Sequence, residues 1–327
     1  MPTDDKTADR REFMLRALRL GGLSAATLGA GAWLHARRER PAESAVLVTD
    51  RRAGIASDPS LPEMVVVQGG EPDPMARRAL AELGGIRRFV ARGDVVVVKP
   101  NIGWDRRPEQ AANTNPALVA SVVQLCLEAG AGRVIVTDMS CNDPRLCFER
   151  SGIAAAARAA GADVILPDER HFKQANLGGE VLTTWPVLEP FLTADKIVNL
   201  PIAKHHSLTG CTLGMKNLYG IIGGQRSRLH QRIHESLVDL LAFARPTLTI
   251  LDAYRVLVRG GPTGGSLADV EVKKTLVAGT DPVAIDAYAA KAWWDLDARR
   301  LPFLRLAQAR GLGKMDFDQV RTKLMSI

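Results

Sequence analysis

Unbroken runs of β-branched residues limit what this chain can fold into. Residues 95–98 read "VVVV" and residues 134–136 read "VIV". A strand with one face in water alternates apolar and polar side chains, whereas an unbroken apolar run is typical of a strand buried on both faces, as in a parallel sheet. The sequence therefore predicts a sheet with helices on both faces.

Helix-like segments separate these strands. "NPALVASVVQLCLEAGA" predicts a helix that begins at Pro116, a residue suited to the first helical turn, and glycine leads from it directly into the strand around 134–136. The repeated order of strand and helix predicts the α/β class, with a mostly parallel, doubly wound (Rossmann-like) sheet. We expect one such domain over residues 63–327, after a polar linker over residues 41–62.

Composition and charge argue against a nucleic-acid partner. The chain has 327 residues and a net charge of +7, but its N-terminal 40 residues carry +3 of that charge. The body is only mildly basic, its charges of both signs are interspersed, and aromatic residues make up 5% of the chain. Nucleic-acid binding usually needs a basic patch or aromatic stacking surfaces, and the sequence offers neither.

The N-terminus resembles a twin-arginine (Tat) export signal. Arg10, Arg11 and Phe13 precede a Gly- and Ala-rich apolar run over 17–34, while Asp9 and Met14 depart from the usual pattern. We expect residues 1–40 to be this signal, so that the protein is periplasmic or otherwise extracytoplasmic and the translocation machinery is a partner. Cleavage and retention as an N-terminal membrane anchor both stay open, and the alternative is an ordinary amphipathic helix.

The four cysteines give no cluster motif. They are widely spaced, without a C-x-x-C pair, which argues against an iron–sulfur cluster or a zinc ribbon. Cys141 and Cys147 stand six residues apart, and the sequence leaves open whether they form a disulfide in an oxidising compartment or two buried thiols.

Polar residues follow several predicted strands at the edge where open α/β sheets bind ligands. Capping of the next helix accounts for Asp281, but Lys99 caps no helix. We therefore expect a substrate-binding group at this edge, made of Lys99, Asn101, Asp138, Asn217 and Asp252.

Residues 200–224, "LPIAKHHSLTGCTLGMKNLYGIIGG", combine histidine and lysine with glycine in a mostly apolar setting. Glycine lets the backbone approach a ligand closely. Lys216, if buried, would have a lowered pKa and act as base or nucleophile, and the alternative is a lysine that reaches out to solvent. We expect His205, His206 and Lys216 to be the catalytic residues.

His230 and His234 stand four residues apart in a segment that predicts a helix. This spacing puts two imidazoles on one helical face, where they can bind one metal ion, although such pairs also occur by coincidence on surfaces. The sequence thus predicts a site for a divalent transition metal at His230, with His234 or His206 as the second ligand, and does not choose among Zn, Ni, Cu and Fe.

Four segments together resemble one known family. They are "VVVVKPNIGW", "NTNPALVASVVQLCLEAGAGRVIVTD", the 200–224 stretch and "AGTDPVAIDAYAA". In their order and in their residues they resemble the motifs of the family called domain of unknown function 362 (DUF362), over about residues 64–315. Some members carry a ferredoxin module, for which this chain lacks the cysteines.

A more distant similarity is to the lactate racemase family, which uses a nickel-pincer nucleotide. That family has a His, a Gly-rich segment, a Lys that tethers the cofactor and a His that binds nickel, and His206, Lys216 and His230 come in this order here. The resemblance implies a catalytic base at His206, a cofactor tether at Lys216 and a metal ligand at His230.

These observations give three functional hypotheses. The first is an exported enzyme, racemase-like or associated with an oxidoreductase, that acts on a small anionic substrate in a His/Lys cleft. The second is a non-catalytic periplasmic protein that binds a metal or an anion. The third is a maturation factor for an exported redox enzyme.

Overall fold

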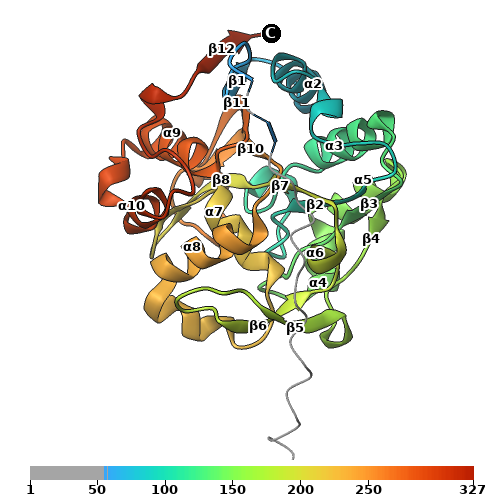
Figure 1. Cartoon of the computed structure of the whole chain (residues 1–327), viewed down its shortest axis with the longest axis vertical. Coiled ribbons are helices and arrows are strands. Elements are labelled where there is room, and N and C mark those ends of the chain that lie inside the picture. The colour runs from blue at the N-terminus through green and yellow to red at the C-terminus, as the bar shows by residue number, and fades with distance from the viewer. Residues whose placement is uncertain (1–54, 57) are drawn as a thin grey trace, which may run out of the picture. The chain divides into compact units, whose positions relative to one another are not determined.

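A computed structural model describes residues 55, 56 and 58–327. Its main element is a ten-stranded sheet, eight of whose strands form a continuous path (Figure 1). In spatial order these are β12 (Thr322–Ser326), β1 (Met64–Gln68), β11 (Val270–Gly279), β10 (Leu248–Leu257), β7 (Lys196–Leu200), β2 (Val95–Pro100), β3 (Arg133–Val136) and β4 (Asp163–Val164).

The sheet is mostly parallel, as the sequence predicts. Strands β10, β7, β2, β3 and β4 follow one another in the sheet and run parallel to one another. Strand β11 departs from the doubly wound expectation because it is antiparallel to both β10 and β1. A loop without an α-helix joins β10 to β11, and a direct return of this kind can only make an antiparallel pair.

Two apolar layers cover the sheet. Val96 and Val98 pack in one core cluster with α2 (Pro72–Glu82), α3 (Pro116–Ala129) and α5 (Ile153–Ala159), while Val97 packs in the other. The second layer includes α8 (Ile233–Ala244), α9 (Pro282–Trp294) and α10 (Pro302–Ala309), and Figure 1 shows α9 and α10 on the opposite side from α2 and α3. Successive side chains on a strand point to opposite faces, so the valine run supplies both layers.

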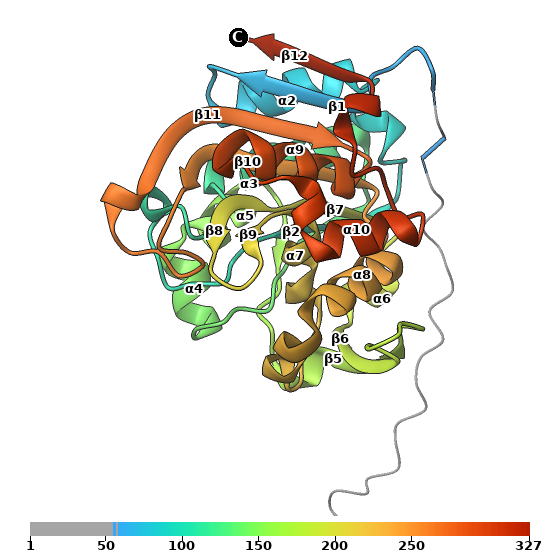
Figure 2. The same cartoon turned by 90° about the vertical axis from the view of Figure 1, so that its left-hand side faces the viewer.

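The 200–224 stretch folds into a hairpin and a short helix at the carboxyl end of β7. Strand β8 (Ile202–His206) pairs antiparallel with β9 (Gly210–Thr212) and parallel with β10, and α7 (Gly214–Asn217) follows. Figure 2 shows this hairpin in front of the sheet, close to α7. The remaining elements include α4 (Pro144–Arg150), α6 (Pro190–Thr193) and a separate hairpin of β5 (Phe172–Asn176) and β6 (Thr184–Leu188).

The expected export signal lies outside the described residues, as does most of the expected linker. Within residues 55, 56 and 58–327, no helix has the length and apolar character that a membrane crossing requires.

All four cysteines are free thiols, so the Cys141–Cys147 disulfide is absent, and Cys141 alone of the four is exposed.

Candidate functional site

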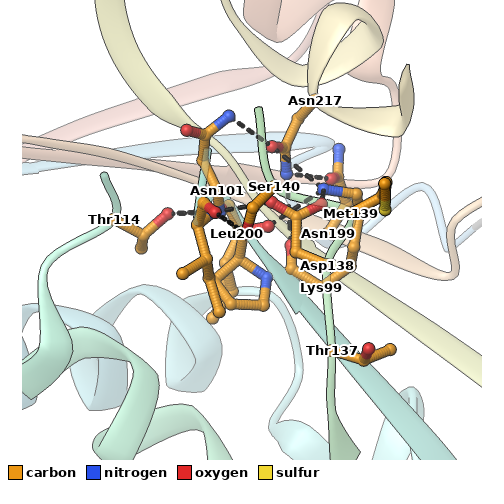
Figure 3. Close-up of polar contacts among 12 residues, drawn as sticks. Lys99, Asn101, Thr114, Thr137, Asp138, Met139, Ser140, Asn199, Leu200 and Asn217 are labelled. Atoms are coloured by element: carbon orange, nitrogen blue, oxygen red, sulfur yellow. Dashed lines mark hydrogen bonds and ion pairs between the residues drawn. The ribbon is translucent and has the colours of Figure 1, made fainter. Parts of the chain in front are cut away.

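A buried ion pair lies at the carboxyl ends of β2 and β3. The Lys99 Nζ donates to Asp138 Oδ1 at 2.6 Å, and both side chains are almost wholly removed from solvent (Figure 3). The second carboxylate oxygen, Oδ2, accepts the Ile102 N–H at 2.6 Å. Burial lowers the pKa of Lys99 and raises that of Asp138, and the contact between the two groups opposes both shifts.

Asn217 connects this pair to neighbouring strands. Its Oδ1 accepts from Lys99 Nζ at 3.2 Å and from Asn101 Nδ2 at 3.1 Å. Its Nδ2 donates to the Lys99 carbonyl and to Asn199 Oδ1. One amide from α7 thereby fixes polar groups from β2 and β7, as Figure 3 shows.

Gly220 leaves the space that the ion pair occupies. A Cβ at this position would lie 1.7 Å from Asp138 Oδ1 and 2.9 Å from Lys99 Nζ. The Gly220 carbonyl also accepts the Met139 N–H, which holds the two segments together. The glycine is therefore required by close approach, as the sequence indicated for this stretch in general terms.

Strand β8 presents alternate residues to the cleft. Lys204 and His206 are two positions apart, share one face and line the same cavity. His205, expected among the catalytic residues, lies between them and does not line that cavity. The prediction placed both histidines at the centre and was wrong for His205, because adjacent residues of a strand point in opposite directions.

The cavity has a volume of about 530 Å³. It brings together groups from β8, α7, the loops after β2 and β3, and the segment before α8. Its polar and aromatic lining residues are Asn101, Trp104, Asp138, Ser140, Cys141, Asn142, Lys204, His206, Thr212, Lys216, Asn217, Tyr219, Gln225, Arg226, Ser227 and His230. Of the predicted site residues, Lys99 lies directly behind this lining, bonded to Asp138 and Asn217.

Three functional groups surround the ring of Tyr219. The Lys216 Nζ lies 4.9 Å from its centroid, the Arg226 guanidinium carbon 5.9 Å and the His230 ring 5.8 Å. The phenol donates to the Arg226 carbonyl, and burial raises the pKa of Tyr219 to about 12, so the ring stays neutral. Sequence reasoning missed Tyr219 and Arg226, since neither follows a predicted strand.

The cations of the cavity differ in their hydrogen-bond partners. Lys204 Nζ donates to the Ala112 carbonyl at 2.6 Å and to Asn101 Oδ1 at 3.0 Å. Arg226 donates to the carbonyls of Met139 and Ser140. Among the described residues, Lys216 has no hydrogen bond or ion pair, and none of these three cations pairs with a carboxylate.

Burial shifts the charge of both cavity lysines toward neutrality. It lowers the pKa of Lys204 to about 7, and it lowers the pKa of Lys216 to about 8 with a smaller contribution from Arg226. Loss of water disfavours an ammonium unless a counter-ion replaces it. The cavity therefore gains most from a bound anion, which restores the charge on both lysines.

The two cavity histidines present opposite functions. His206 Nδ1 accepts the Leu208 N–H at 3.1 Å, so the ring proton sits on Nε2, and burial with nearby Lys216 lowers its pKa to about 3. His230 Nδ1 instead lies 3.1 Å from the Ser227 carbonyl and donates to it, which leaves a lone pair on Nε2. The base role expected for His206 does not fit this tautomer, whereas His230 can accept a proton.

Two further predicted residues lie away from the cavity. Asp252 accepts the Asn115 N–H at 2.7 Å and the Tyr254 N–H, so it holds the start of α3, and burial raises its pKa to about 6. His234 stacks on Phe303 of α10, with ring centroids 6.2 Å apart. The expected rim position of Asp252 and the expected pairing of His234 with His230 are both wrong.

The histidine pair fails because the helix is interrupted. His230 belongs to a 3₁₀ segment, Arg226–Arg232, and α8 begins only at Ile233, after non-helical backbone at Arg232 with φ of −130° and ψ of 50°. The i, i+4 geometry needs one continuous α-helix. Within the described residues, no three His, Cys, Asp or Glu side chains are grouped to hold a metal ion, so the donors present do not fit a metal bound by protein alone.

Asp286 of α9 is a positioning residue that the sequence did not reveal. Its two oxygens accept the N–H groups of Gly214 at 2.6 Å and Met215 at 2.9 Å, at the start of α7. Burial raises the pKa of this carboxyl to about 7. The residue fixes the helix that carries Lys216 and Asn217.

A larger hollow of about 790 Å³ lies near α9 and α10 and has a different character. Its cations are exposed and form ion pairs: Lys291 with Asp295, Arg299 with Asp297 and Lys314 with Glu63. Exposed pairs of this kind leave no unpaired cation among its lining residues for an anionic ligand. The smaller cavity is thus the better candidate for a functional site.

Comparisons with known proteins agree with the sequence resemblance. Residues 96–291 match the model of a family described as "Domain of unknown function (DUF362)". The chain is 28% identical over 251 residues to the thylakoid-associated protein sll1697 of Synechocystis sp., an alignment that covers 72% of this chain and 74% of that protein.

Two solved structures are also similar. A lactate racemase apoprotein from Thermoanaerobacterium thermosaccharolyticum gives a TM-score of 0.40 at 11% identity, over 73% of this chain and 57% of that one. A protein from Thermotoga maritima gives a TM-score of 0.38 at 12% identity, over 73% of this chain and 60% of that one. The chain therefore spans less than two thirds of each solved chain.

Proposed function

Since the chain belongs to the DUF362 family, whose description assigns no reaction, we propose an activity from the site itself: an enzyme that acts on a small anionic substrate in the cavity around Tyr219. The observation that supports this most strongly is the set of three cations, Lys204, Lys216 and Arg226, that have no carboxylate partner within residues 55, 56 and 58–327. A folded protein rarely keeps desolvated cations together unless a ligand compensates them.

The cavity combines positively charged side chains with a hydrogen-bond donor and a proton acceptor. Lys204 and Arg226 are held by backbone and amide oxygens, so their side chains are fixed in position facing an anion. His206 offers a fixed hydrogen-bond donor at Nε2, and His230 offers a proton acceptor. Bound charge next to a proton acceptor is the arrangement that general acid–base catalysis needs. A binding protein would need the cations alone.

Titration with anions tests this proposal. We expect sulfate, phosphate and the dicarboxylate succinate to bind the full-length protein at one site per chain, at constant ionic strength, in isothermal titration calorimetry. Chloride serves as the control for general screening. If none of the three polyvalent anions binds saturably, the proposed function is wrong.

The pH dependence of sulfate binding has a defined sign. The anion favours the ammonium forms, and these are complete only below the pKa values of about 7 and 8 for Lys204 and Lys216. We therefore expect sulfate affinity to fall as pH rises from 6 to 9, since each neutral lysine must then take up a proton on binding. Sulfate keeps its charge over this range, unlike phosphate. An affinity that is flat or rises with pH would contradict this use of the lysines.

Export is a further part of the proposal, supported by the order of Arg10, Arg11, Phe13 and the apolar run after them. Replacing both arginines by lysine is expected to keep the full-length protein in the cytoplasm, because the twin-arginine route recognises the paired arginines. Cell fractionation measures this, and N-terminal sequencing of the exported protein separates cleavage from anchoring. Unchanged fractionation of the double-lysine variant would rule this route out.

A further inference from the structure

We infer that Lys216 is an amine nucleophile that forms a Schiff base with the carbonyl carbon of a 2-oxo acid. The inference rests on the proposed function, because it takes the anion to be a carboxylate and adds a reacting carbonyl beside it. The geometry of Lys216 and of its neighbours carries it in four steps.

The first step is that the Lys216 amine is free to react. Among the described residues it makes no hydrogen bond or ion pair, and its Nζ lies over the ring of Tyr219, 4.9 Å from the centroid. The side chain lines the cavity, and its Nζ is not fully buried, so the amine opens onto the hollow. An amine engaged by neither carboxylate nor carbonyl can present its lone pair to a ligand.

The second step is the contrast with Lys204 in the same cavity. Lys204 is 1% exposed, and its Nζ donates to two oxygen acceptors, the Ala112 carbonyl and Asn101 Oδ1. A carbonyl carbon cannot reach a nitrogen enclosed in this way. Although burial lowers the pKa of both lysines, contact geometry makes Lys204 the fixed cation and Lys216 the nucleophile.

The third step is the placement of the substrate carboxylate. Arg226 and Lys216 line the same cavity and both approach the ring of Tyr219, with the guanidinium carbon 5.9 Å and Nζ 4.9 Å from its centroid. In a 2-oxo acid the carboxylate is bonded directly to the carbonyl carbon, so a cation in the same hollow can hold the acid while the amine attacks. Trp104 and Tyr219 add apolar wall, and about 530 Å³ has room for an acid with a large side chain.

The fourth step is proton transfer. The neutral Lys216 amine attacks the carbonyl carbon, a C–N bond forms, and the oxygen becomes a hydroxyl by taking up a proton. Loss of that oxygen as water then gives the imine, so amine and ketone become imine and water with no oxidant or reductant. His230 Nε2 can accept the proton from nitrogen and return it to the leaving oxygen, and His206 Nε2–H can donate a hydrogen bond to that oxygen.

Reductive trapping tests the inference. Full-length protein is incubated with pyruvate or phenylpyruvate and sodium cyanoborohydride, which reduces the imine to a stable secondary amine. Peptide mass spectrometry is expected to locate an added mass, equal to the acid less one oxygen atom, on Lys216. Sulfate should slow the labelling, because it competes for the same cations.

Matched variants give the experiment its controls. Lys216→Arg keeps a cation but has no nucleophilic amine, so we expect it to lose labelling at this site while binding sulfate more tightly than Lys216→Met does. Lys291→Met removes an exposed lysine of the other hollow and should leave the labelling unchanged. Sulfate binding without labelling of Lys216 would overturn the Schiff base and leave the proposed function standing. Absence of both would overturn both.

Discussion

Replacing Asp138 by alanine is expected to lower the free energy of unfolding by about 3–5 kcal/mol, the usual cost of breaking a buried ion pair from one side. The variant leaves the Lys99 ammonium without its counter-ion in a fully buried position, and it also removes the acceptor of the Ile102 N–H. Chemical denaturation monitored by circular dichroism measures the change.

A matched control separates this loss from the general effect of removing an aspartate. Asp163 of β4 pairs with Arg133 across an exposed edge, with both side chains more than half exposed. We expect Asp163→Ala to change the denaturation midpoint little, because exposed pairs contribute little. Adding Lys99→Met to Asp138→Ala should recover part of the lost stability. Equal midpoints for Asp138→Ala and Asp163→Ala would show that the buried pair does not hold the strand ends together.

The second large effect combines two changes of opposite sign. Lys216→Met is expected to raise the thermal midpoint while it lowers sulfate affinity about ten- to hundredfold, the cost of one lost charge-assisted contact. The free protein gains because a desolvated ammonium, which has no hydrogen bond or ion pair within the described residues, is replaced by a side chain of similar shape that burial favours. Differential scanning fluorimetry and calorimetric titration measure the two quantities.

Opposite signs identify a residue kept for binding rather than for folding. Lys204→Met should behave differently, since it leaves the Ala112 carbonyl without its donor and so loses stability as well as affinity. Lys291→Met is the control for charge alone. If Lys216→Met lowers the thermal midpoint and leaves sulfate affinity unchanged, this lysine is structural and the role given to it here is wrong.

Much of the fold could be predicted from the valine-rich runs, because a strand buried on both faces leaves an unambiguous pattern. The mostly parallel sheet and the helix that begins at Pro116 are confirmed. The β8–β9 hairpin was not predicted, since "KHHSLTGCT" shows neither a regular alternation of apolar and polar residues nor a continuous apolar run. Strand β12 was also missed, because only Leu324 and Met325 of its five residues are apolar and its partner strand, β1, lies some 250 residues earlier in the chain.

The candidate site divides along the same lines. Lys99, Asn101 and Asp138 meet at one sheet edge because parallel strands end together, a rule that needs no tertiary detail, and α7 brings Asn217 to them. Which side chains of the irregular stretches face the cavity depends on backbone conformation that spacing does not encode. The direction of β8 separates His206 from His205, and the break at Arg232 separates His230 from His234.

The central claim is that one cavity gathers Lys204, Lys216 and Arg226 to hold an anion, and Cys141 offers a direct test. This thiol lines the cavity and is exposed, while Cys126, Cys147 and Cys211 are buried. Its rate of alkylation by the uncharged reagent iodoacetamide therefore reports whether the cavity is filled. We predict that sulfate slows the reaction saturably in the full-length protein at pH 6, by about tenfold when the site is full, and slows it far less in Lys216→Met. A rate that sulfate leaves unchanged, or slows equally in both proteins, would contradict the account.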